Sequence, residues 1–146
     1  MGMFDAIAIS STGMSAERLR MDVIADNLAN ADTTRDANGQ PYQRKEVVLQ
    51  AMGSGSFAQM LGTASGGDAA PAGVQVAGIV ADPSPPRRVY DPGHPDADAQ
   101  GYVSMPNVNP VTEMVDLITA SRSYEANVTA MNAAKQMFTK TLNVLR

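Results

Sequence analysis

The feature that most constrains the fold is a heptad pattern in the last third of the chain. Between residues 114 and 145, mostly apolar side chains recur at alternating intervals of three and four residues, with Ser121 and Lys135 as polar breaks. This spacing is typical of a coiled-coil seam. Pro110 suits a first helical turn, and Asn109 before it is a good N-cap. The sequence therefore predicts a helix over about 110–145, with a seam of Met114, Leu117, Ser121, Tyr124, Val128, Met131, Lys135, Phe138, Leu142 and Leu145.

A second helix is expected near the start of the chain, over residues 3–30. One apolar line repeats at intervals of three and four, with Ser11 and Arg18 as breaks, and a second line lies on a neighbouring face. Two apolar stripes on one helix indicate burial against more than one partner. The first line is Phe4, Ile7, Met14, Met21, Ala25 and Leu28, and the second is Ile9, Ala16, Leu19 and Val23.

The middle of the chain has a different composition. Residues 42–50 and 74–80 are rich in β-branched side chains and predict strands, and residues 87–90 predict a short third strand. Residues 53–73 combine Gly with Ala and Ser, which is typical of a loop or linker. The expected fold is therefore mainly α with a small β insert. We divide it into an N-terminal helix (1–34), an insert (35–109) containing the loop 53–73, and a C-terminal helix (110–146).

Asn27 and Asn30 stand where the first helical pattern stops. Asn is a poor interior helix former, because its side chain competes for backbone hydrogen bonds. One hypothesis is that these residues only end the helix, with an Asn in the left-handed cap conformation. The other is that their amides also satisfy loose backbone groups or reach a neighbouring subunit.

The amino-acid composition limits the functions that the chain can have. The net charge of −4 argues against a nucleic-acid partner, and the absence of Cys excludes disulfides and thiol catalysis. His94 beside Asp91, Asp96 and Asp98 forms too weak a pattern for a metal site. Asp96 also begins a sequence like a calcium loop, but Asn107 occupies the position of the bidentate Glu, so we reject it. We expect no cofactor, no metal and no enzymatic activity.

The ends of the chain also limit its location. The N-terminus lacks the basic and apolar regions of a cleaved signal peptide, and no apolar run is long enough to span a membrane. If the chain leaves the cytoplasm, we expect export without a cleaved signal.

Long stretches of the sequence resemble a known family. "SSTGMSAERLRMDVIADNLANADTT" (10–34) and "NPVTEMVDLITASRSYEANVTAMNAAKQMFTKTLNVLR" (109–146) resemble the two terminal signatures of the axial proteins of the bacterial flagellum. "TTRDANGQPYQRKEVVLQA" (33–51) and "DPSPPRRVYDPGHPDADAQGYVSMPNVNPVTEM" (82–114) are similar to proximal rod subunits of that family. The resemblance covers the chain except about 52–72.

The resemblance implies a structural role. Members of the family are exported unfolded by the flagellar type III apparatus and assemble helically in the periplasm. Their rod transmits torque from motor to hook, and their terminal helices pair around the export channel. The ends are commonly disordered in the free subunit. Because two helices alone cannot bury two stripes each, the residues themselves also indicate that association completes the fold.

We therefore expect a non-enzymatic rod subunit whose partners are copies of itself, other rod proteins and the export apparatus. A secreted coiled-coil effector or export chaperone is the alternative, and a carboxylate hydrolase acting on peptidoglycan is a distant third. Candidate assembly residues are Phe4, Ile7, Met14, Met21, Asn27, Leu28, Asn30, Met114, Leu117, Tyr124, Asn127, Val128, Met131, Phe138, Leu142 and Leu145.

Overall fold

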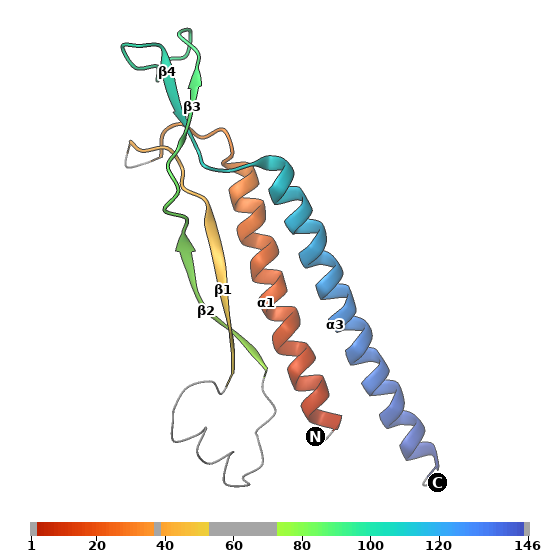
Figure 1. Cartoon of the computed structure of the whole chain (residues 1–146). Helices are drawn as coiled ribbons and strands as arrows, with labels where there is room; N and C mark the ends of the chain where they lie inside the picture. The colour runs from red at the N-terminus through yellow and green to blue at the C-terminus, as the bar shows by residue number, and fades with distance from the viewer. Residues whose placement is uncertain (1–2, 37–38, 53–72, 145–146) are drawn as a thin grey trace, which may run out of the picture.

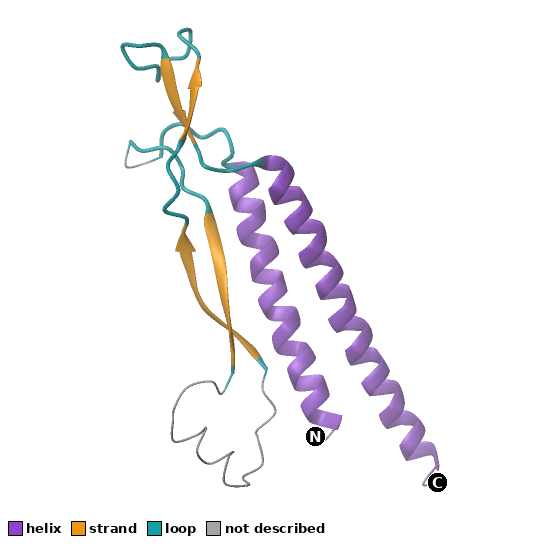
Figure 2. Ribbon diagram, in the orientation of Figure 1, coloured by secondary structure: helices purple, strands orange, loops and turns teal. Residues whose placement is uncertain are grey.

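Two long antiparallel helices and two β-hairpins make up the fold (Figure 1). The computed structural model describes residues 3–36, 39–52 and 73–144. Helix α1 is joined to helix α3 through the hairpins β1–β2 and β3–β4, and the loops between them gather where α1 ends and α3 begins (Figure 2). The elements are α1 (Met3–Ala29), β1 (Lys45–Ala51), β2 (Val74–Ala81), β3 (Arg87–Tyr90), β4 (Tyr102–Met105) and α3 (Pro110–Val144). The predicted fold class, paired terminal helices around a small β insert, is confirmed.

The start of α3 forms as the sequence predicts. Asn109 Oδ1 accepts a hydrogen bond from the Val111 backbone N–H at 3.1 Å, which is the N-cap geometry. The Asn109 backbone carbonyl accepts a hydrogen bond from the Glu113 N–H at 3.0 Å. Pro110 is the first helical residue, where its missing N–H costs nothing.

Small side chains let the two helices approach closely. A Cβ added at Gly13 of α1 would stand 3.0 Å from Asn127 Nδ2 of α3. Ala120 and Ala134 of α3 are almost fully buried. Toward the other end of the hairpin, the rings of Phe4 and Phe138 meet edge to face at 5.8 Å.

The predicted α3 seam alternates between two rows of residues, and one of these rows is displaced by one residue from the observed seam. Met114 and Lys135 are exposed, while the residues just before them, Glu113 and Ala134, are buried. Ala120 is likewise more buried than Ser121. The observed seam consists of Glu113, Ala120 and Ala134, which are buried, and of Leu117, Tyr124, Asn127 and Met131, which are half-buried. Apolar character misled the prediction, because the close approach of the helices favours small residues and Glu113 is neutralised by an ion pair.

The second stripe of α1 is covered by the β1–β2 hairpin. Both strands contact α1, and Ala16 and Val23 of this stripe are buried. Thr12 Oγ1 accepts a hydrogen bond from the Val74 N–H at 3.2 Å, and a Cβ at Gly73 would lie only 2.7 Å from that oxygen. The insert therefore supplies a partner for α1 that the sequence prediction assigned to other chains.

The second hairpin extends beyond the ends of the helices (Figure 1). Strand β3 pairs antiparallel with β4, in a register that places Arg87 opposite Met105 and Tyr90 opposite Tyr102. The sequence predicted β3 with its observed bounds but missed β4. The turn closes at Gly101, whose φ of +82° favours glycine and whose neighbour is the Tyr90 ring.

Candidate functional site

A cluster of polar side chains joins the two helices to the β insert. We define this polar junction as Asp26, Asn27, Tyr42, Arg44, Lys45 and Glu113. Asn27 lies at its centre and is 1% exposed. Its Nδ2 donates to the Lys45 carbonyl at 2.9 Å and to Glu113 Oε2 at 3.1 Å. Its Oδ1 accepts from the Lys45 N–H and from the Tyr42 hydroxyl, both at 2.9 Å.

These four bonds use both donors and both acceptor sites of the Asn27 amide. The side chain therefore has no hydrogen bond left for a neighbouring subunit. One amide instead ties α1 to the start of β1 and to the first turn of α3. Of the sequence-based alternatives for Asn27, the structure shows the one in which its amide satisfies backbone groups, and these groups belong to Lys45 of the same chain.

Arg44 neutralises the buried carboxylate of Glu113. Arg44 Nε lies 2.5 Å from Glu113 Oε1, and the Glu113 side chain is 1% exposed. The same guanidinium pairs with Glu46 and lies 3.6 Å from Asp116. Partial burial acts to lower the pKa of Arg44, but the hydrogen bonds to Glu113 and Glu46 outweigh it, so the pKa is raised. A buried carboxylate without this partner would be strongly destabilising.

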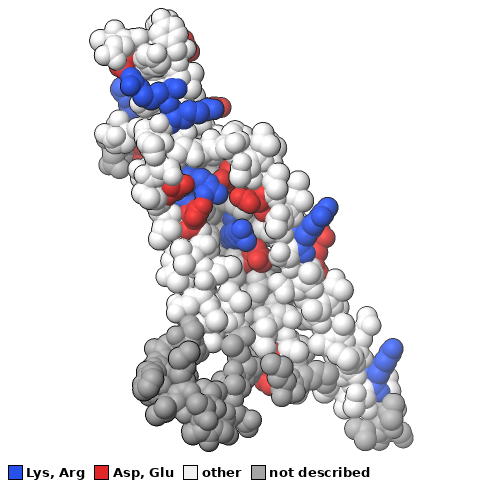
Figure 3. Space-filling view, in the orientation of Figure 1, with Lys and Arg blue, Asp and Glu red and all other residues white. Residues whose placement is uncertain are grey.

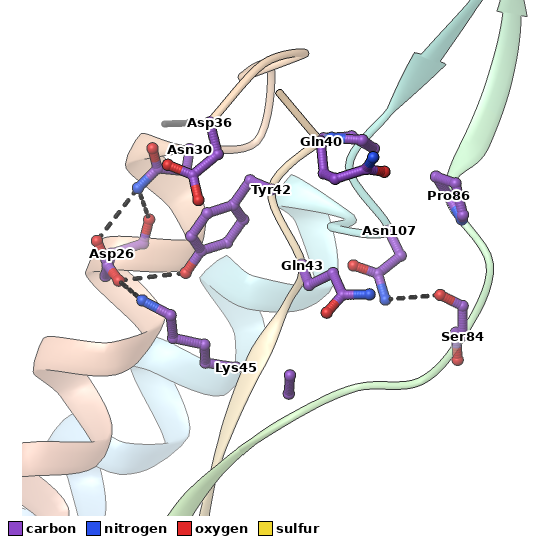
Figure 4. A pocket seen from close by; sticks show the side chains of 12 residues that line it. Asp26, Asn30, Asp36, Gln40, Tyr42, Gln43, Lys45, Ser84, Pro86 and Asn107 are labelled. Carbon is purple, nitrogen blue, oxygen red and sulfur yellow. Dashed lines mark hydrogen bonds and ion pairs between the residues drawn. The ribbon is translucent and has the colours of Figure 1, made fainter. Parts of the chain in front are cut away.

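The exposed side of the polar junction is a second ion pair. Lys45 Nζ lies 2.9 Å from Asp26 Oδ2 (Figure 4). The Tyr42 hydroxyl shares its one proton between this oxygen, at 3.2 Å, and Asn27 Oδ1. The hydrogen bond from Lys45, helped by Tyr42, holds the pKa of Asp26 below its usual range. Burial, reinforced by the Asp26 charge, raises the pKa of Tyr42. These three side chains line an open pocket of about 620 Å³ that also reaches Asn107 and Ser84.

Asn30 ends helix α1 through its side-chain amide, as one of the two sequence-based hypotheses proposed, and not through a left-handed cap conformation. Its Nδ2 donates to the Asp26 carbonyl at 2.9 Å and to Asp26 Oδ1 at 3.1 Å, one turn back. Its Oδ1 accepts from the Thr33 hydroxyl at 3.2 Å. The left-handed cap conformation was wrong, since no non-glycine residue within 3–36, 39–52 and 73–144 has a positive φ. Asn30 satisfies the last turn with its side chain instead.

The polar groups near His94 serve the local backbone and ion pairs. His94 Nδ1 accepts from the Asp96 N–H at 3.1 Å, and the Asp96 carboxylate pairs with Arg35 at 2.8 Å. Asp98 accepts from the N–H groups of Gln100 and Tyr102, which together hold its pKa below the usual range. Across the part of the chain that the structure describes, no group of three or more His, Asp or Glu side chains is placed to hold a metal ion.

The outward face of α3 is an uncovered apolar surface. Neither hairpin packs on this helix, whose contacts with other elements are all with α1. Val111 is 70% exposed, Val115 58% and Ile118 56%. Near the other end Met137 and Leu142 are also at least half exposed. In Figure 3 charged side chains gather over the β3–β4 hairpin and the polar junction, while much of the surface below them is uncharged. No helix within the described ranges is long and apolar enough to cross a membrane.

The candidate assembly residues occupy several environments. Half-buried positions include Ile7, Met14, Met21, Leu28, Asn30, Leu117, Tyr124, Asn127, Val128 and Met131, and those most open to solvent are Phe4, Met114, Phe138 and Leu142. Asn27 is buried, and Leu145 lies outside the described residues. Their role in subunit contacts stays a prediction.

Of the polar junction the sequence analysis singled out only Asn27; it missed the other five members and one further polar tether. Tyr42, Arg44 and Lys45 were seen only as part of a predicted strand, and neither Asp26 nor Glu113 was singled out. Asn107 accepts from the Arg44 N–H at 2.8 Å and donates to the carbonyls of Asp82 and Ser84. One signal was present in the sequence, because Glu113 lies four residues before Leu117 and so on the seam side of an amphipathic helix.

Comparison with known families matches both ends of the chain. The family described as "Flagella basal body rod protein" matches residues 7–35, and "Flagellar basal body rod FlgEFG protein C-terminal" matches residues 99–144. These two segments hold most of α1, all of β4 and α3, and therefore both helices of the pair.

Characterised relatives match over the full length. The flagellar basal-body rod protein FlgC of Bacillus subtilis is 50% identical, with 99% of both chains aligned. FlgC of Borreliella burgdorferi is 43% identical over 100% of this chain and 99% of its own length. FlgC of Escherichia coli is 43% identical over 99% of this chain and 98% of its own.

Proposed function

Since the chain belongs to the FlgC family of flagellar basal-body rod proteins and is a structural rod subunit, we propose that it assembles helically with copies of itself and with other rod proteins. The assembly forms the hollow shaft that transmits torque from motor to hook. The family is structural, which sets aside both the secreted effector or chaperone and the peptidoglycan hydrolase.

One observation carries this proposal. Helix α3 presents an outward face on which Val111, Val115 and Ile118 are each more than half exposed, although its opposite face is packed on α1. Apolar surface of this kind on a water-soluble chain marks a contact with another protein. A subunit with one covered and one uncovered helix face is suited to repeated packing.

The proposal extends to the path by which the chain reaches the rod. The flagellar type III apparatus exports it, and it joins the rod in the periplasm. The small core supports passage in an unfolded state, because the buried hydrophobic side chains within residues 3–36, 39–52 and 73–144 are those of Ala, Val and Ile. Within the rod, residues 1–34 and 110–146 would pack around the export channel, with the β1–β2 hairpin lying on α1 and the β3–β4 hairpin extending beyond the helix ends.

A charge in the exposed end of α3 tests this function. Leu142 is 50% exposed. Leu142→Asp places a carboxylate on a surface that the proposal buries between subunits, at a cost of several kcal/mol unless it is neutralised. In bacteria carrying it as the sole copy, we expect normal synthesis, loss of the chain from isolated basal bodies and loss of swimming.

Asn143→Asp is the matched control, because it adds the same charge at the next position on an already polar side chain. We expect it to swim. Normal swimming and normal basal-body content of Leu142→Asp would contradict the proposed packing of this end.

A further inference from the structure

Helix α3 carries a second heptad line on the side away from α1. Val115, Ile118 and Arg122 each lie two residues from a seam position, which places them on the opposite side of the helix. All three are exposed, as is Glu125 in the next turn. This outer stripe of α3 changes along its length from apolar to charged.

Helix α1 carries a matching line. Asp22 and Ala25 lie two residues before the buried Ile24 and Asn27, so they too face away from the partner helix. Arg18 and Ala29 continue this outer stripe of α1, and all four side chains are exposed. It changes in the opposite direction, from charged to small and apolar.

The charges on both outer stripes have no ion pair within the described ranges 3–36, 39–52 and 73–144. The salt bridges there involve other side chains, and Arg18, Asp22, Arg122 and Glu125 take part in none of them. Four unpaired charges in two opposite-sign pairs therefore lie on the faces that the helix hairpin leaves open.

We propose that the outer stripe of α3 packs antiparallel on the outer stripe of α1 from a second copy of this chain. A single register satisfies every position. It places Arg122 opposite Asp22 and Glu125 opposite Arg18 of the other copy. The same register also places Ile118 opposite Ala25, Val115 opposite Ala29 and Thr129 opposite Ser15.

Other arrangements of the same stripes fit less well. Two α3 stripes packed antiparallel would also join Arg122 to Glu125, but they would set Ile118 against Thr129 and leave its apolar surface on a polar partner. A parallel pairing of α3 with α1 that keeps Arg122 opposite Asp22 sets Ile118 against Arg18. The α3–α1 contact alone matches charge with charge and apolar with apolar.

The contact has a consequence for the assembly. Different surfaces meet, so each copy offers a free α1 stripe on one side and a free α3 stripe on the other, and the array does not close as a dimer. This inference rests on the proposed function, because it specifies how rod subunits meet. It adds the pairs of residues that set their register.

Cysteine crosslinking tests the register directly, since the natural chain has no Cys. Ala25→Cys and Ile118→Cys are introduced together, and basal bodies are treated with a short bismaleimide linker. We expect dimers and higher multimers of the chain, because the two positions face away from each other within one copy. Each single variant is the control and should stay monomeric.

A charge exchange tests the same contact without crosslinking. Arg122→Glu should face Asp22 of the neighbour, and we expect at least about a tenfold loss of chain from basal bodies. Adding Asp22→Arg in the same chain should restore most of it. Adding Glu125→Arg instead should not restore it, although it would if two α3 stripes met.

The outcomes separate this inference from the proposed function. If the chain is absent from basal bodies even without substitutions, the proposed function fails. If the cysteine variants enter basal bodies and swim but give no multimers, the register is wrong and the function stands. Multimers from Ile118→Cys with Thr129→Cys, or crosslinks only to a protein of another mass, would also overturn the α3–α1 contact.

Discussion

Replacing Asn27 by Ala is expected to destabilise the helix hairpin through the loss of one internal tether. The substitution removes four hydrogen bonds at a side chain that is 1% exposed. Two of the partners keep another bond, because Glu113 still has Arg44 and the Tyr42 hydroxyl still has Asp26. The backbone N–H and carbonyl of Lys45 lose the amide that they share.

The magnitude follows from these two backbone groups. Leaving a buried polar group unpaired costs about 1–3 kcal/mol. Lys45 is only half-buried, so water relieves part of this cost. We expect a total of about 2–3 kcal/mol, which lowers the fraction of folded, assembly-competent chain by roughly 30- to 150-fold where that fraction is small.

The measurement is the amount of chain in isolated basal bodies, with the exported fraction as the secretion control. Asn30→Ala is the matched variant, because its bonds lie within the exposed last turn of α1 and their loss costs about 0.5–1 kcal/mol. We expect Asn27→Ala to be exported but poorly incorporated, and Asn30→Ala to be nearly normal. Equal incorporation of the two variants would refute the tether.

Three further predictions concern the helix pair. In a dilute solution of the free subunit, we expect the backbone amides of α1 and α3 to exchange quickly, because the buried core is small and α3 packs on α1 alone. Strong protection of these amides in a hydrogen-exchange experiment would contradict coupled folding and assembly. Gly13→Val should reduce rod incorporation more than Ala8→Val, because a Cβ at Gly13 would lie 3.0 Å from Asn127 Nδ2 while Ala8 is exposed. Equal effects of the two variants would argue against the close approach of the helices. The pKa of Asp26 is lowered by Lys45 in the folded chain, so its stabilising contribution is complete above the unfolded pKa of about 3.9 and is lost as pH falls through the lower folded value. Rods should therefore dissociate more readily below about pH 4, and Asp26→Asn should weaken that dependence when rod turbidity is followed during acid titration.

Local signals in the sequence were sufficient for the helices and for three of the strands. The cap at Asn109 and the first-turn Pro110 set the start of α3, and both act within a few residues of themselves. Strand β4 was missed because its pairing with β3 spans a turn-rich stretch whose closure depends on Gly101. A local pattern does not specify such a pairing.

The same difference between local signals and long-range contacts applies to the functional residues. Asn27 was singled out because an Asn inside a helical pattern is unusual, but its partners come from β1 and α3, far away in the sequence. The Arg44–Glu113 pair has the same character, and no spacing rule connects its two members. Family resemblance supplied the role of the chain, whereas only the structure shows which faces of the helices remain open.

The two helices of the pair differ in length, since α1 has 27 residues and α3 has 35. At a rise of 1.5 Å per residue the difference is about 12 Å, or slightly more than two turns. The Phe4–Phe138 contact places the start of α1 beside the last turns of α3. The C-terminal end of α3 therefore extends past the start of α1. A helical end of two turns is not stable in water by itself. We expect a neighbouring subunit to cover this unpaired end of α3, and the length of that end would then set how far successive copies are offset along their common axis.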